Sequence, residues 1–136
     1  MRIHVLSLGC ARTLVDSEGL AGILEKAGHT IADKIDQAEC VVVNTCAFIR
    51  EAEEESVNTI LDLAELKRGG NLKRLYVVGC LPQKRRNEKE DLLKLLPEVD
   101  GFLGTGDLPR LPELIAGNGV GSSRFFVASP VPTLLR

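Results

Sequence analysis

The chain has 136 residues, of which 44% are hydrophobic, and this fits one domain with a real hydrophobic core. Its formal net charge of −2 excludes nucleic-acid binding driven by net charge alone, but it does not exclude binding through a local basic patch. No apolar stretch approaches the ~20 residues of a membrane span, and the N-terminus lacks a signal-peptide layout. We therefore expect a cytoplasmic protein with no membrane partner.

Short apolar runs alternate with amphipathic stretches along the chain. Strands are expected at residues 3–8, 29–35, 41–43, 75–78 and 100–104, with an edge strand at 124–128. Helices are expected at residues 16–27, 51–68, 82–96 and 108–116. Asp16 or Ser17 can cap the first helix, and Gly28 stands where a C′ glycine belongs. In the second helix one apolar stripe is expected, formed by Val57, Ile60, Leu61 and Ala64.

This alternation predicts a three-layer α/β fold, flavodoxin-like or Rossmann-like, around a mostly parallel five-stranded sheet of order 2-1-3-4-5. The run Val41-Val42-Val43 lacks alternation, so the third strand is expected to be buried on both faces. Residues 1–128 are expected to form the domain, and residues 129–136, which contain two prolines, a linker. In such sheets the chemistry lies at the carboxyl ends of the strands, near the switch point between strands 1 and 3.

Three of the four cysteines occupy equivalent places. Cys10, Cys46 and Cys80 each follow the end of an expected strand and precede an expected helix. Strands 1, 3 and 4 are neighbours in the expected order, so the three thiols are predicted to converge on one edge of the sheet. Helix N-termini at that edge favour thiolates and anionic clusters. Three cysteines on a four-iron cluster leave one iron open, which indicates chemistry rather than simple electron transfer.

The other potential ligands do not fit this edge. Cys40 opens the third strand, roughly 20 Å from Cys46 at ~3.3 Å per residue, and is interpreted as a core residue. His4 opens the first strand and His29 follows the first helix, so both are expected at the opposite edge as structural or surface residues. A structural zinc site needs four ligands and only three are at hand, but a zinc-binding module stays an alternative.

Linked sequence blocks resemble the signatures of the methylthiotransferases. They are Ser7-Leu8-Gly9-Cys10 with Asp16-Ser17-Glu18, Asn44-Thr45-Cys46-Ala47-Phe48-Ile49, Val78-Gly79-Cys80-Leu81-Pro82-Gln83, and the later block Val99-Asp100-Gly101-Phe102. The resemblance covers nearly the whole chain. The first two blocks are similar to the RimO-type branch, which modifies an aspartate of a small-subunit ribosomal protein. The tRNA-modifying branch stays an alternative, because Ala11-Arg12-Thr13 departs from the pattern of both branches.

By this resemblance, Cys10, Cys46 and Cys80 hold an auxiliary [4Fe–4S] cluster whose open iron supplies sulfur for methylthiolation. The family joins this N-terminal domain to a radical S-adenosylmethionine domain, which binds S-adenosylmethionine and a second [4Fe–4S] cluster through a C-x-x-x-C-x-x-C triad. That triad is absent from this sequence. The resemblance therefore implies a transferase as the full-length protein, with this chain inactive alone and no catalytic residue within it.

Several features keep a simpler interpretation. The three cysteines could be buried residues of a flavodoxin-like binding module, because buried cysteine is common. Asp16, Ser17 and Glu18 serve either as a helix cap or as polar contacts to a substrate or to another domain. Asn44, two residues before Cys46, either donates to cluster sulfurs or serves the turn. The glycines within residues 101–106 do not have the spacing of a dinucleotide-binding fingerprint.

Overall fold

The computed structural model describes residues 2–8, 11–45, 50–70, 72–79, 81–82, 94, 96, 98–104, 111–115 and 125–126. The elements are, in chain order, β1 (Arg2–Ser7), α1 (Ala11–Lys26), β2 (Thr30–Ile31), the 3₁₀ turn η1 (Ile35–Gln37), β3 (Cys40–Thr45), α2 (Arg50–Arg68), β4 (Arg74–Gly79), β5 (Gly101–Leu103), α5 (Leu111–Ile115) and β6 (Phe125–Phe126). Most of the predicted helix at 82–96, the glycine-rich stretch at 117–123 and the predicted linker lie outside the described residues.

The described strands form one sheet of order β2-β1-β3-β4-β5-β6, in which every neighbouring pair is parallel. The predicted fold class and the order 2-1-3-4-5 are therefore confirmed, and β6 continues the sheet as the predicted edge strand. Both outer strands, β2 and β6, are only two residues long. The centre of the sheet is β3, which pairs with β1 on one side and with β4 on the other.

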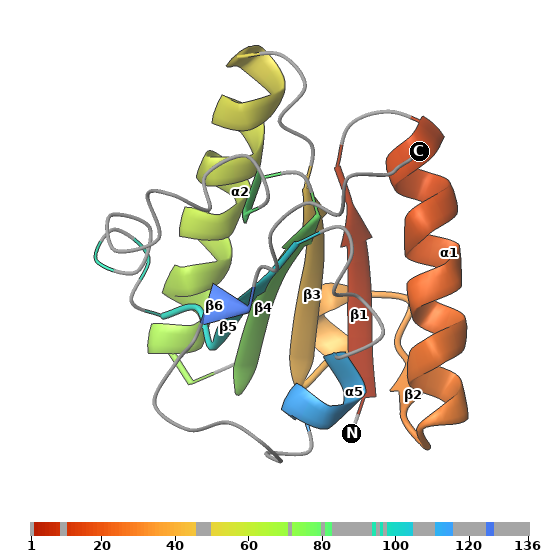
Figure 1. The fold of residues 1–136 in the computed structure, drawn as a ribbon. Helices are drawn as coiled ribbons and strands as arrows, with labels where there is room; N and C mark the ends of the chain where they lie inside the picture. Colours follow the sequence, from red (N-terminus) through yellow and green to blue (C-terminus); the bar gives the residue numbers. More distant parts are fainter. Residues whose placement is uncertain are drawn as a thin grey trace.

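Helices lie on both faces of the sheet (Figure 1), and one apolar layer packs against each face. On one face, Val42 and Val78 pack with residues of α1 and α5. On the other face, Val41, Val43 and Val77 pack with residues of α2. Alternate residues of β3 thus enter opposite layers, and all six residues of this strand are buried, as its unbroken apolar run predicted.

Helix α1 begins earlier than the sequence indicated. It starts at Ala11, so Ser17 lies inside the helix and is buried rather than acting as an N-cap. The capping interpretation of this stretch was wrong because Ser17 has a tertiary partner, described below, which a local pattern does not reveal. The end of the helix is confirmed: Gly28 has φ +98°, and the His29 N–H donates to the Leu24 carbonyl oxygen at 3.1 Å.

The buried stripe of α2 differs from the predicted one at one position. Ile60 and Ala64 face the sheet as expected, but Leu61 is 39% exposed whereas Leu63 is 3% exposed. Among the α2 residues whose burial the structure describes, the buried ones are Glu53, Ser56, Ile60, Leu63 and Ala64, which follow helical spacings of three and four. Two of these buried residues, Glu53 and Ser56, are polar. A stripe predicted from hydrophobic residues alone therefore faces a slightly different direction from the buried one.

Candidate functional site at the carboxyl edge of the sheet

The carboxyl ends of β1, β3 and β4 lie level with one another, and we call them the carboxyl edge. Ser7 of β1 is paired with Asn44 of β3, and Thr45 of β3 with Gly79 of β4. The Leu8 N–H donates to the Asn44 carbonyl oxygen at 3.0 Å, which extends the β1–β3 pairing by one further residue. The three strands predicted to converge therefore end at one place.

The predicted ligands Cys10, Cys46 and Cys80 lie outside the described residues, so their role as ligands stays a prediction. In the sequence, Cys46 directly follows the last residue of β3, and Cys80 directly follows the last residue of β4. Cys10 comes three residues after the end of β1 and directly before the first residue of α1.

Buried polar side chains of the described residues gather around the carboxyl edge. They are Ser17 of α1, Asn44 and Thr45 at the end of β3, and Glu53 and Ser56 in the first two turns of α2. The rest of the described core is apolar apart from the Tyr76 hydroxyl. Burying a polar group is unfavourable unless it is hydrogen-bonded. This local concentration of buried polar side chains therefore makes the carboxyl edge the candidate functional site.

Thr45 uses its hydroxyl both as donor and as acceptor. Thr45 Oγ1 donates to the Val78 carbonyl oxygen at 2.7 Å and accepts a hydrogen bond from the Leu81 N–H at 3.0 Å. Both contacts are buried, and they join residues more than 30 positions apart in the sequence. The hydroxyl thus connects the end of β3 to the end of β4 and to the residues that follow β4.

Asn44 and Gly79 form a second close contact at this edge. Asn44 Nδ2 donates to Ser17 Oγ at 3.0 Å, which connects β3 to α1. A Cβ atom added at Gly79 would lie 2.5 Å from Asn44 Oδ1 and 2.9 Å from the Thr45 carbonyl oxygen. Gly79 also has φ +99°, a conformation that side-chain-bearing residues rarely adopt. The last position of β4 is therefore closed to any residue but glycine.

Sequence reasoning found Asn44 but missed the hydroxyls of Ser17 and Thr45 as part of this edge. Asn44 drew notice because it stands two residues before Cys46 in the sequence. The same signal was present in Thr45, which is the next residue. Ser17 gave a local signal that suited a helix cap equally well, and its true partner lies 27 residues away.

Cys40 lies at the opposite end of β3 and is a core residue, as predicted. It is fully buried among the apolar residues packed beneath α1. Burial raises the pKa of the Cys40 thiol from its ordinary 9.0 to about 12, and the carboxylate of Asp100 acts in the same direction. Since metal ligation requires a thiolate, this thiol is poorly suited to bind a metal.

The protonated state of Cys40 predicts a specific alkaline instability. Above pH 9 the thiol ionises in the unfolded chain but not in the folded one, so the free energy of unfolding falls as the pH rises toward 12. At pH 10 this contribution amounts to about 1 kcal/mol. Urea unfolding at pH 8 and pH 10 should show a correspondingly smaller drop for Cys40→Ala than for the wild type. Equal drops in the two proteins would contradict the burial argument.

The two histidines lie away from the carboxyl edge, as expected. His4 stands in the first half of β1, and its Nδ1 donates to the Ala32 carbonyl oxygen at 2.9 Å. His29 precedes β2, and partial burial lowers its pKa from the ordinary value. Within the described part of the chain no group of three His, Cys, Asp or Glu residues is placed to hold a metal ion.

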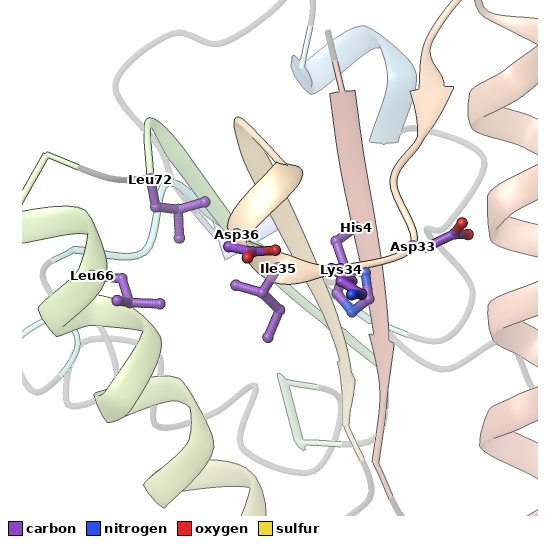
Figure 2. A pocket seen from close by; sticks show the side chains of 7 residues that line it. All are labelled: His4, Asp33, Lys34, Ile35, Asp36, Leu66 and Leu72. Carbon is purple, nitrogen blue, oxygen red and sulfur yellow. The ribbon is translucent and has the colours of Figure 1, made fainter.

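An open groove of about 740 Å³ lies on the α2 face of the sheet, near the amino ends of the strands (Figure 2). The residues that line it are His4, Asp33, Lys34, Ile35, Asp36, Leu66 and Leu72. The second strand is shorter than predicted: β2 spans Thr30–Ile31 rather than residues 29–35, and the chain then reaches β3 through the 3₁₀ turn η1. The groove lies at the opposite end of the sheet from the carboxyl edge.

Together these features define a doubly wound α/β domain with a polar site at the carboxyl ends of its central strands. The chain belongs to uncharacterized protein family UPF0004, whose sequence pattern matches residues 2–104. That stretch includes the whole carboxyl edge, together with all of β1 through β5. None of the helices that the structure describes is long and apolar enough to cross a membrane.

Curated relatives name the kind of protein that this chain resembles. Ribosomal protein uS12 methylthiotransferase RimO of Trichlorobacter lovleyi is 46% identical over 130 residues, which cover 95% of this chain and 28% of the relative. The protein of the same name from Citrifermentans bemidjiense is 49% identical over 115 residues, covering 85% of this chain and 25% of the relative. The resemblance to RimO-type methylthiotransferases is thereby confirmed. The chain spans about a quarter of the length of these relatives.

Proposed function

We propose that the chain is the cluster-binding part of a RimO-type methylthiotransferase, in which Cys10, Cys46 and Cys80 hold one auxiliary [4Fe–4S] cluster. The carboxyl edge carries this proposal, because β1, β3 and β4 are adjacent and each is followed within three residues of sequence by one of these cysteines. Two interstrand spacings of ~4.8 Å span roughly 10 Å, a width that three side chains can bridge around one small inorganic cluster.

The residues present at this edge fit such a group. Three thiolates are the soft ligands that iron–sulfur clusters take, although zinc accepts thiolates as well. The strand-end residues Asn44 and Thr45 are neutral and hydrogen-bonded, so they can orient neighbouring ligands without adding charge. The buried Cys40 thiol at the far end of β3 is excluded from the donor set by its place in the core.

When bound, the cluster would supply sulfur for methylthiolation at an iron that three cysteines leave open. The residues of this chain would hold and orient it. We assign the binding of S-adenosylmethionine, the second [4Fe–4S] cluster and the transfer itself to the part of the whole protein that this chain does not span. The names of the relatives indicate ribosomal protein uS12 as the substrate, and we propose an aspartate of that protein as the acceptor, with tRNA as the alternative.

Anaerobic reconstitution with iron and sulfide tests the cluster directly. The purified protein is compared with Cys10→Ala, Cys46→Ala and Cys80→Ala, and Cys40→Ala, at the first residue of β3, serves as the matched control. We expect the wild type and Cys40→Ala to gain four iron and four sulfide per chain with visible absorption, and each of the other variants to lose this capacity because a ligand is missing.

Other outcomes identify the competing functions. Bound zinc without acid-labile sulfide would favour the zinc-binding module. Colourless but folded protein in every case would favour a binding module with buried cysteines. Far-UV circular dichroism of each variant separates the loss of a ligand from the loss of the fold.

A further inference from the structure

The hydroxyl of Thr45 contacts the backbone on both sides of Cys80 in the sequence. Its donor contact reaches Val78, two residues before Cys80, and its acceptor contact reaches Leu81, the residue after it. The distances, 2.7 Å and 3.0 Å, are those of well-formed hydrogen bonds. A hydroxyl engaged at both its donor and its acceptor has one orientation, so the backbone that enters and leaves this position is held relative to β3.

The neighbouring side chain of Asn44 makes an equivalent connection to another segment. It donates to Ser17 Oγ, and Ser17 belongs to α1, whose first residue directly follows Cys10. The same side chain lies so close to Gly79 that a Cβ atom there could not be accommodated. Asn44 and Thr45 therefore join the segments that flank Cys10 and Cys80 to the strand that leads into Cys46.

Core stability does not by itself require these polar residues. The preceding residues of β3, Cys40 to Val43, are all apolar and equally buried, so apolar side chains fill this strand well. Replacing both partners of a buried hydrogen bond by apolar groups of similar shape is often close to neutral for stability. The polar pair adds hydrogen bonds that hold β3 against two segments distant in the sequence. One of them lies 27 residues from β3, and the other lies more than 30 residues from it.

We propose that Asn44 and Thr45 are positioning residues that set the relative placement of the three cysteine-bearing segments before a cluster binds. This inference rests on the proposed function. It assigns a second role to β3, the strand that precedes Cys46 in the sequence: its last two residues hold the segments next to Cys10 and Cys80 in place.

Thr45→Val and Thr45→Ser test this role as a matched pair. Valine keeps the shape of threonine but removes both hydrogen bonds, whereas serine keeps the hydroxyl. After anaerobic reconstitution we expect Thr45→Val to release iron to a chelator roughly tenfold faster than the wild type, as is typical for loss of a group that orients metal ligands. We expect its electron paramagnetic resonance spectrum after reduction to broaden or shift. Thr45→Ser should restore both the release rate and the spectrum.

The outcomes separate this inference from the function on which it rests. A wild type that takes up no iron–sulfur cluster overturns the proposed function, and the inference with it. A wild type that takes up the cluster, beside a folded Thr45→Val with the same release rate and spectrum, overturns the inference alone. If Thr45→Val does not fold, Ser17→Ala removes the other arm of the contact, and it must then show faster iron release for the inference to stand.

Discussion

Replacing Gly79 by alanine is expected to lower the free energy of unfolding by roughly 3 kcal/mol. A residue with a side chain at φ +99° costs about 1–2 kcal/mol, and the new Cβ would also lie 2.9 Å from the Thr45 carbonyl oxygen. The Thr45 backbone is buried and belongs to the central strand β3, so it cannot move aside cheaply, and the steric cost adds to the conformational one. In thermal unfolding the midpoint should fall by about 10 °C.

Gly28→Ala is the matched control for this prediction. Gly28 has nearly the same backbone angle, φ +98°, but nothing lies within 4 Å of an added Cβ atom. We therefore expect only the conformational cost of about 1 kcal/mol there. Equal losses at the two positions would mean that the contact with Asn44 and Thr45 at the end of β4 contributes nothing.

The second large effect is expected on the buried face of α2, where truncating a side chain should lower the free energy of unfolding. Leu63 is 3% exposed and packs in the layer between α2 and the sheet, so Leu63→Ala should cost about 3 kcal/mol through lost burial and the cavity it leaves. Urea unfolding of the purified protein gives this value directly, from the midpoint and the slope of the transition.

Leu61→Ala removes the same number of atoms from the same helix and is the natural control. Leu61 is 39% exposed, so its truncation should cost well under ~1 kcal/mol. The apolar pattern of the sequence alone predicts the reverse order for these two leucines. The pair therefore decides between the stripe read from the sequence and the stripe seen in the structure.

Much of the fold could be predicted because its signals are local. The unbroken valine run of β3 indicated a strand buried on both faces, and Gly28 marked the end of α1 through a requirement of the backbone itself. Alternating strands and helices then left few sheet orders to consider. The start of α1 and the face of α2 were harder, because Ser17 and Ser56 are polar residues that the fold buries, and the partner of Ser17 lies 27 residues away.

The candidate site could be located from the sequence, but not its internal contacts. Three cysteines after three strands indicated the edge, since parallel strands end on the same side. The contact of Thr45 with Leu81 and that of Asn44 with Ser17 depend on which strands become neighbours and in which register. A polar dipeptide at the end of an apolar strand shows that such contacts exist without naming the partners.

The two-residue outer strands have a consequence for how this domain meets other proteins. A strand as short as β2 or β6 offers too few unpaired N–H and C=O groups for another chain to extend the described sheet. Edge-to-edge aggregation of native molecules through these two described strands is thereby disfavoured.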